Sequence, residues 1–160
     1  MEQLRSEGGV RGVFTEFESL KEADIPFLCE MWNWEGDLTV LPHKWAEVLN
    51  EDLGEEVFDS KQLKENFVQK PEFDPLAFFF ITSRSNALGS ILSWPTNEPG
   101  VYDILNLASK QSRTEGVEKA LVLLSLNYLK KKGAKLVEIR IGTKVEARVE
   151  MLKEVGFVFN

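Results

Sequence analysis

The stretch from residue 101 to residue 142 constrains the fold of this chain more than any other, because strand and helix patterns alternate within it. Residues 101–108 form an apolar run typical of a strand, and the polar residues 109–116 cannot continue it. From Val117 onward, apolar residues recur at the spacing of one helix face. They are Val117, Ala120, Leu121, Leu124 and Tyr128. The helix is expected to end at Gly133, after lysines that suit the negative end of the helix dipole.

A second apolar run, residues 136–141, follows this helix and predicts another strand. Two strands joined by a helix of this length predict a parallel, right-handed crossover. The helix then begins at the carboxyl edge of the first strand, where its free N–H groups form an anion-binding site. The sequence therefore predicts an α/β unit with a binding site near residues 109–118.

The segments before this unit predict a strand, a helix and an antiparallel hairpin. Residues 13–18 alternate as a half-buried strand does, and a helix is expected to begin near Asp24. Its inward-facing residues would be Phe27, Leu28, Met31 and Trp32. Residues 76–83 and 87–94 predict two strands joined by the short polar turn Arg84-Ser85-Asn86.

Two further helices are predicted from their capping residues. Asp59 and Gln62 form a candidate capping box for a short helix that ends near Gln69. Residues 143–155 predict a closing helix, capped by Gly156. The acidic stretch at residues 47–59 is interpreted as a solvated surface in preference to a rim that binds an acceptor.

Composition limits the class of protein. With 160 residues, of which 43% are hydrophobic, the chain is expected to form a single domain over residues 1–160, with residues 1–11 as a flexible tail. Residues 1–9 do not resemble a targeting peptide, and the longest apolar run, residues 76–81, is far shorter than a membrane span. Cys29 is the only cysteine, so no disulfide framework or thiol metal site is expected. A cytoplasmic protein is predicted.

The charge of the chain bears on its partners. A net charge of -7 and a pI near 4.9 repel phosphate backbones, which argues against nucleic acid as the main partner and favours a cationic partner or substrate. The sequence also lacks the Gly-x-Ser-x-Gly and Gly-x-x-x-x-Gly-Lys-Ser/Thr motifs, and His43 is its only histidine. Hydrolase and nucleotide-hydrolase classes therefore lack their residues.

The order of these elements resembles the GCN5-related N-acetyltransferase family from about Phe14 to Phe159. Residues 113–118, Arg-Thr-Glu-Gly-Val-Glu, are similar to the family's Arg/Gln-x-x-Gly-x-Gly/Ala loop, which binds acetyl-coenzyme A. Residues 151–157 are similar to its Leu-Tyr-x-x-x-Gly-Phe signature, and residues 88–91 to its third strand, where glycine is common. The resemblance implies a mixed, mostly antiparallel central sheet with helices on both faces, and a short or missing last strand.

The resemblance also implies a function. The implied function is the transfer of an acetyl group from acetyl-coenzyme A to a primary amine, without a metal. The acceptor would be a small molecule or a peptide, and it is expected to be cationic. Asp103, at about the family's acidic position on the central strand, is the candidate general base. The residues implied in cofactor binding are Leu107, Ala108, Arg113, Thr114, Glu115, Gly116, Val117, Glu118 and Lys119.

Three residues depart from the family's pattern. Glu118 replaces a Gly or Ala, and Glu115 places a second carboxylate where a phosphate should lie. Each charge would cost about 1 kcal/mol of binding at a surface dielectric. Leu152 occupies the position of the tyrosine that often protonates the leaving thiolate. A catalytically silent domain of the same fold, acting as a binding or regulatory module, is therefore the alternative hypothesis.

The chain also ends soon after Gly156-Phe157, where family members continue with further strands. An open sheet edge is expected to result. Either a second copy in a homodimer or a missing C-terminal segment would then pair with that edge.

Overall fold

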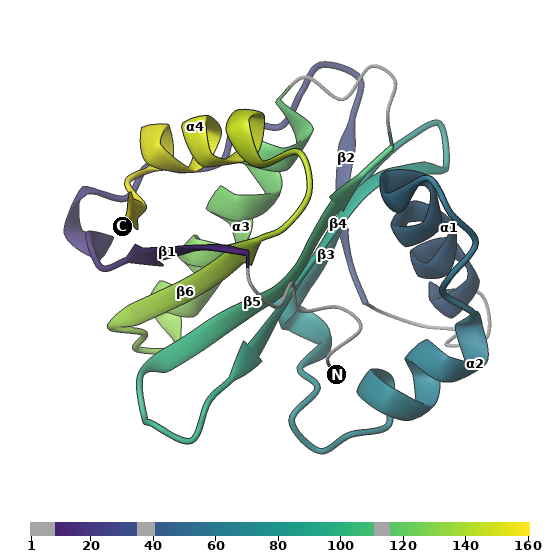
Figure 1. Ribbon diagram of the computed structural model, residues 1–160, viewed down its shortest axis with the longest axis horizontal. Coiled ribbons are helices and arrows are strands. Elements are labelled where there is room, and N and C mark those ends of the chain that lie inside the picture. The colour runs from purple at the N-terminus through teal and green to yellow at the C-terminus, as the bar shows by residue number, and fades with distance from the viewer. Residues whose placement is uncertain (1–8, 35–40, 111–115) are drawn as a thin grey trace.

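The computed structural model describes residues 9–34, 41–110 and 116–160, which form one twisted sheet with helices on both faces (Figure 1). Within these residues the sheet has seven strands in the order β2-β3-β4-β5-β6-β1-β7. β5 and β6 are parallel, and every other neighbouring pair is antiparallel. The strands are β1 (Val10–Phe14), β2 (Glu30–Asn33), β3 (Phe78–Ser83), β4 (Asn86–Pro95), β5 (Val101–Ser109), β6 (Leu136–Ile141) and β7 (Val158–Phe159).

Helices cover both faces of this sheet (Figure 1). α3 (Val117–Lys131) and α4 (Val145–Val155) lie on one face. α1 (Leu41–Leu53), α2 (Ser60–Leu63) and a π-helical turn (Lys64–Val68) lie on the other. Two 3-10 turns, Phe17–Ser19 and Pro75–Ala77, precede β2 and β3. Among the described residues, no helix is both long and apolar enough to span a membrane.

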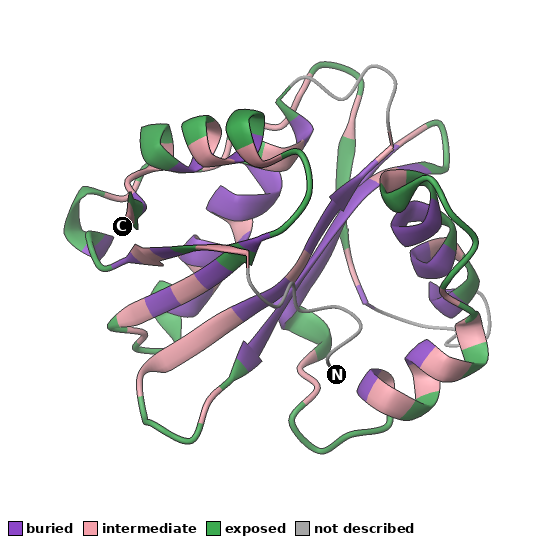
Figure 2. Ribbon diagram, viewed as in Figure 1, coloured by how far each residue is buried: buried purple, intermediate pink, exposed green. Residues whose placement is uncertain are grey.

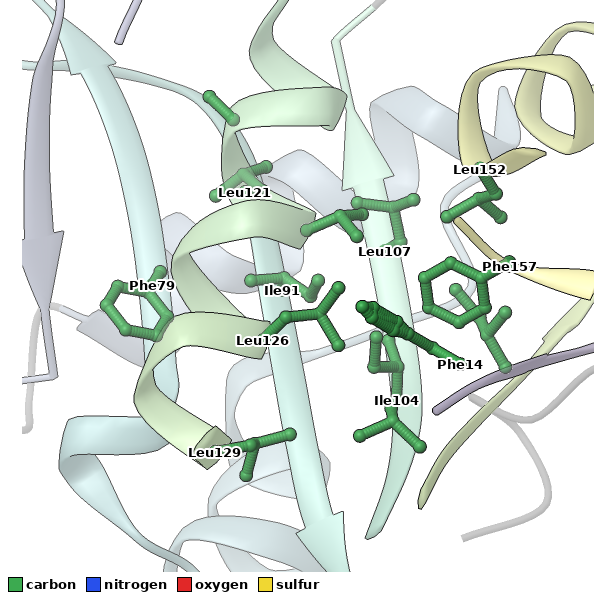
Figure 3. Packing of buried hydrophobic residues seen from close by; sticks show 14 of the residues in the cluster. Phe14, Phe79, Ile91, Ile104, Leu107, Leu121, Leu126, Leu129, Leu152 and Phe157 are labelled. Atoms are coloured by element: carbon green, nitrogen blue, oxygen red, sulfur yellow. The ribbon is translucent and has the colours of Figure 1, made fainter. Parts of the chain in front are cut away.

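The core has two halves, one on each face of the sheet. β3 supplies both, because Phe79 and Ile81 pack under α3 while Phe78 and Phe80 pack under α1. A strand that is buried on both faces reads as a continuous apolar run, as this one does. Figure 2 shows the buried residues along the central strands and on the helix sides that face them. Figure 3 shows the α3 half, in which Phe14, Leu126 and Phe157 meet.

The crossover from β5 through α3 to β6 has the predicted elements and the predicted parallel pairing. α3 ends as expected, with Gly133 at a φ of +86°. The hairpin of β3 and β4 is also confirmed. Arg84 and Ser85, the two residues of its turn, both have positive φ, as a tight hairpin turn requires. Asp59 caps α2 by accepting a hydrogen bond from the Gln62 N–H at 2.8 Å.

The N-terminal strand differs from the prediction in position and in role. It covers Val10–Phe14 in place of residues 13–18, so the expected tail is too long by at least Val10 and Arg11. β1 pairs antiparallel with β6 along its whole length, and with β7 on its other side. Gly12 allows this arrangement, because a Cβ there would lie 2.4 Å from the ring of Phe159.

β1 is the strand that lies beside β6 on the side away from β5. β1 covers the edge of β6, and β7, which is short as predicted, lies at the edge of the sheet. The edges of the sheet are β2 and β7. A homodimer stays a prediction, and β6 does not need one.

The segment around Asp24 was wrongly predicted as a helix. Residues 30–33 form β2, which pairs with β3 from Glu30 to Asn33. Phe27 and Leu28, expected to face inward, are 90% and 70% exposed. Four apolar residues within one helical turn and a half are a weak signal, and pairing with an already buried strand overrides it.

Tyr128 ties the C-terminal half of α3 to the loop before β3, since its hydroxyl donates a short hydrogen bond to Asp74. Burial and this bond raise the pKa of Tyr128 well above its ordinary value of about 10. A group whose pKa is raised in the folded state contributes stability that is complete below the unfolded pKa and is lost at higher pH. We expect the free energy of unfolding in urea to fall above pH 10, and to fall less in Tyr128→Phe.

The other tyrosine provides the control for this experiment. Tyr102→Phe removes a hydroxyl that has no hydrogen bond to Asp74, and most of the fall in stability above pH 10 should remain, because Tyr102 is the smallest of the causes that raise the pKa of Tyr128. Equal slopes in wild type and Tyr128→Phe would show that Tyr128 does not carry the effect.

Candidate functional site

A cavity lies where β5 and β6 part. Their parallel pairing ends at Ile104 and Ile139. Just beyond this point, Leu105 is an extra residue in β5, because Asn106 pairs with Leu92 while Ile104 pairs with Ser93. A bulge of this kind bends its strand and interrupts the ladder. The following residues of both strands line a cavity of about 110 Å³, which α1 closes from the other side.

A larger groove, of about 590 Å³, lies between the first turn of α3 and α4. Gly116 is the N-cap residue of α3 and has the left-handed conformation, with a φ of +82°. As a glycine, it offers no side chain to cap the first turn of the helix. Of the residues that the structure describes, four cationic and two acidic side chains line this groove. They are Lys110, Lys119, Lys144 and Arg148, with Glu118 and Glu154. The N–H groups of the first helical turn favour an anion. Each of the four cations already has an acidic partner: Lys110 pairs with Glu47 and Glu51, Lys119 with Glu154, Lys144 with Asp52, and Arg148 with Asp52 and Glu118.

Arg148, from α4, lies at the centre of a buried ionic network. Its Nε and Nη2 donate to the two carboxylate oxygens of Glu118 at 3.0 and 2.8 Å. Nη2 also donates to Asp52 of α1 at 2.5 Å, and Nη1 to the hydroxyl of Thr143 at 3.1 Å. The Arg148 side chain is only 4% exposed. Burial by itself would lower the pKa of Arg148, but Glu118 and Asp52 outweigh burial and raise it.

The end of β5 belongs to the same network. The Ser109 N–H donates to Asp52 at 3.1 Å, and the Ser109 hydroxyl donates to Glu118 at 2.5 Å. Lys144 adds an ion pair with Asp52 at 2.9 Å. The two carboxylates therefore already accept hydrogen bonds from the Ser109 N–H, the Ser109 hydroxyl and the Arg148 guanidinium.

Arg148 is the residue common to the linings of the cavity and the groove. The cavity and the groove therefore adjoin at this residue.

The sequence-predicted cofactor residues fall into three groups. Leu107 lines the cavity, and Gly116, Glu118 and Lys119 line the groove. Val117 and Ala108 are 1% exposed and pack in the core. Arg113, Thr114 and Glu115 lie outside the described residues.

Asp103, the candidate base, lies in the paired part of β5. Its partners in the ladder are Trp94 on β4 and Glu138 on β6, and the residues of β5 that line the cavity begin with the next residue, Ile104. Its role as a base stays a prediction. In the described part of the chain, no cluster of three His, Cys, Asp or Glu side chains could hold a metal ion.

Sequence reasoning missed Asp52 and Arg148, although their spacing carried a signal. Arg148 lies three residues after Val145 and four before Leu152, on the inward stripe of the closing helix. Asp52 follows Val48 by four residues and Leu49 by three, on the buried side of α1. A charge on an apolar stripe requires a partner of opposite charge, and two such charges of opposite sign predict an ion pair.

Solved structures of N-acetyltransferases resemble this chain over most of its length. A GCN5-related N-acetyltransferase from Sphaerobacter thermophilus matches with a TM-score of 0.73 and 16% identity, over 100% of this chain and 51% of that one. The ribosomal-protein-S18-alanine N-acetyltransferase from Escherichia coli matches with a TM-score of 0.66 and 14% identity, over 81% of this chain and 77% of that one. Ard1 from Thermoplasma volcanium matches with a TM-score of 0.64 and 17% identity, over 83% of this chain and 84% of that one.

These likenesses establish the fold. The chain has the GCN5-related N-acetyltransferase fold, as the order of its elements predicted. It spans about half the length of the Sphaerobacter thermophilus protein. No family model matches the sequence, and no curated protein matches it.

Proposed function

We propose that this chain is an acetyl-coenzyme A-dependent N-acetyltransferase that acts on a cationic primary amine. The observation that carries the proposal is the groove at the N-terminus of α3, which is lined by basic side chains and adjoins the cavity between β5 and β6 at Arg148. Solved N-acetyltransferases of the same fold support it. The net charge of -7 supports a cationic acceptor, since a negative surface attracts such a molecule.

The groove offers backbone N–H groups and basic side chains to the phosphates of the acetyl donor. Lys119, Gly116 and the first-turn N–H groups of α3 would hold a diphosphate, and Lys110 and Lys144 line the same groove. Leu107 offers an apolar wall inside the cavity. When bound, acetyl-coenzyme A would supply the thioester whose acetyl group passes to the amine. Glu118 is the residue that does not suit this ligand, because its carboxylate holds Arg148.

Residues of this chain would have to remove a proton from the acceptor amine. An amine is mostly protonated near neutral pH and must lose a proton before it can attack. Asp103 is the proposed acceptor of that proton. Leu152, 0% exposed, cannot donate a proton to a leaving thiolate, so that proton would have to come from elsewhere.

A second candidate function is a catalytically silent binding domain of this fold. It is favoured by the network itself, in which Asp52 takes the Ser109 N–H and Glu118 takes two of the Arg148 donors. A domain that does not bind the cofactor can keep such carboxylates without cost to activity.

Thermal unfolding with acetyl-coenzyme A separates these two functions. A ligand present at 100 times its dissociation constant stabilises a protein by about 2.7 kcal/mol, and for a domain of this size we expect the melting temperature to rise by several degrees. Release of free thiol in the presence of polyamines would then test transfer to an amine. Lys64→Glu changes the charge on the opposite face of the sheet and is the control for the effect of net charge on the melting temperature. An unchanged melting temperature at millimolar ligand would leave the silent domain as the function.

A further inference from the structure

We infer that the outer edge of β2 (Glu30–Asn33) is a docking site for an extended segment of a partner protein in which apolar and basic residues alternate. None of the residues of β2 lines the groove or the cavity of the proposed function, so this role is independent of acetyl transfer.

β2 is an edge strand that lacks the usual protection of an edge. It is the last strand of the sheet, and no other strand in the described part of the chain pairs with its outer side. Its sequence, Glu-Met-Trp-Asn, contains no proline or lysine, the residues that commonly keep an edge from pairing. The main chain of such an edge can pair with an extended chain, which then adds a strand to the sheet.

Exposed apolar side chains gather around this edge. Of the eight large apolar side chains that are exposed in the described residues, five lie on β2 or next to it. They are Phe27, Leu28, Met31, Trp32 and Leu76. Leu76 adjoins β2, because its carbonyl accepts a hydrogen bond from Asn33 Nδ2 at 3.1 Å. Clustered apolar surface of this kind marks an interaction site, whereas single exposed residues do not.

The turn before β2 holds one of these side chains outward at a conformational cost. The Cys29 N–H donates to the Pro26 carbonyl at 3.0 Å, and Leu28 within this turn has a φ of +65°. Glycine or asparagine suits that conformation better than leucine does. Leu28 is 70% exposed and gains little burial in return. Backbone strain without a gain in packing is typical of positions that serve binding.

On the α3 face of the sheet, β2 borders an apolar pocket. Met31 and Asn33 lie on this face, because opposite residues of a ladder share a face and their partners on β3 belong to the α3 half of the core. Both line a pocket of about 290 Å³, together with Leu76 and Leu124. Lys131 is the only charged lining residue among those described. This pocket suits an apolar side chain of a docked strand and repels a cationic one.

On the opposite face, β2 presents a carboxylate beside an aromatic ring. Trp32 lies there, since its partner Phe80 belongs to the α1 half of the core, and Glu30 is two residues away on the same face. Both side chains are exposed, and Trp32 Nε1 donates to Glu30 at 3.4 Å. An arginine or lysine of a docked strand can pair with Glu30 and lie over the indole ring.

These two faces define the partner, because the side chains of an added strand alternate between them. Apolar residues would face the pocket, and basic residues would face Glu30 and Trp32. A second copy of this chain fits less well, since its own β2 would bring no cation to Glu30.

The first test measures the binding of two capped peptides by calorimetry, one of alternating arginine and valine and one of alternating glutamate and valine. We expect the basic peptide to bind more tightly on the order of tenfold. Glu30→Lys should weaken its binding about tenfold, and Glu146→Lys, an equal change of charge on the exposed side of α4, about twofold or less. Equal losses in the two variants would mean that net charge alone attracts the peptide, and the docking site would be excluded.

The second test examines pairing with the main chain of β2. Only every second N–H of a strand points toward its neighbour. Of two basic peptides, one N-methylated on all valines and the other on all arginines, only one should therefore lose binding. The unmodified peptide should also slow hydrogen exchange of the amides of residues 30–33. Equal affinity of the two methylated peptides would overturn the inference, and so would a free protein that is already a dimer with these amides protected.

Leu28→Asn separates docking from folding. Asparagine accepts a positive φ, so the melting temperature of the free protein is expected to rise by about 2 °C, while binding of the basic peptide weakens by about threefold or more. A lower melting temperature with unchanged affinity would show that Leu28 supports the fold and does not contact a strand docked along β2. None of these measurements uses acetyl-coenzyme A, so their outcome does not depend on whether the chain is an active enzyme.

Discussion

Trp45→Ala is expected to lower the free energy of unfolding by about 3–5 kcal/mol. Trp45 is 0% exposed and lies at the centre of the core half beneath α1. Its ring packs edge-on against Phe78 of β3, Phe67 of the π-helical turn and Trp34, with centroids 5.0, 5.8 and 5.9 Å away. Alanine would leave a cavity among rings that belong to separate segments and cannot all move inward.

Chemical unfolding in guanidinium chloride measures this loss directly. Phe27→Ala is the matched control, because it also truncates an aromatic side chain, but one that is 90% exposed. Its effect is expected to stay within about 0.5 kcal/mol. Similar losses in the two variants would show that Phe27 is buried in solution, or that Trp45 is not a central contact.

The part of the fold that could be predicted from sequence is the part that local rules determine. α3 combines one apolar face, a lysine-rich last turn and a capping glycine, and each of these acts within a few residues. The hairpin of β3 and β4 is fixed in the same way by its turn. Agreement between local signals made these boundaries accurate to within one or two residues.

The part that could not be predicted depends on pairing between distant segments. β1 and β6 are separated by more than a hundred residues, and nothing in the sequence of residues 10–14 indicates which strand they pair with. The same holds for β2, whose few apolar residues fit a helix as well as a strand until β3 is placed beside it. Periodicity cannot choose between two structures over so short a stretch.

In the candidate site, too, local departures from a pattern could be predicted from the sequence, and contacts between distant residues could not. Glu118 stood out as a departure from the acetyl-coenzyme A loop, because the sequence showed a carboxylate where a small residue was expected. The ionic network around Glu118 could not be seen in the sequence, since its partner Arg148 lies 30 residues away, and Asp52, the other carboxylate that binds Arg148, lies 96 residues from Arg148. The acidic stretch that contains Asp52 was interpreted as solvated, yet this member of it is 11% exposed and paired.

Arg148→Met is expected to destabilise the protein by about 3–5 kcal/mol, the usual cost of leaving buried charges without their partner. Methionine fills a similar volume, so the loss would come from charge more than from packing. Asp52 and Glu118, whose side chains are 11% and 19% exposed, would then face each other without a cation between them, although Lys144 would still reach Asp52 at 2.9 Å. Urea unfolding near neutral pH measures the loss.

Two comparisons decide whether this loss belongs to the buried network. Arg11→Met breaks the ion pair with Glu138 at 2.9 Å, but Arg11 is 42% exposed, and the expected cost is below about 1 kcal/mol. Arg148→Met combined with Glu118→Gln is expected to be more stable than Arg148→Met alone, because one of the two unpaired carboxylates is gone. If the double variant is instead as unstable as the sum of the single variants, the two residues are not coupled. The buried pair would then not be what holds α3 and α4 together at the end of β5.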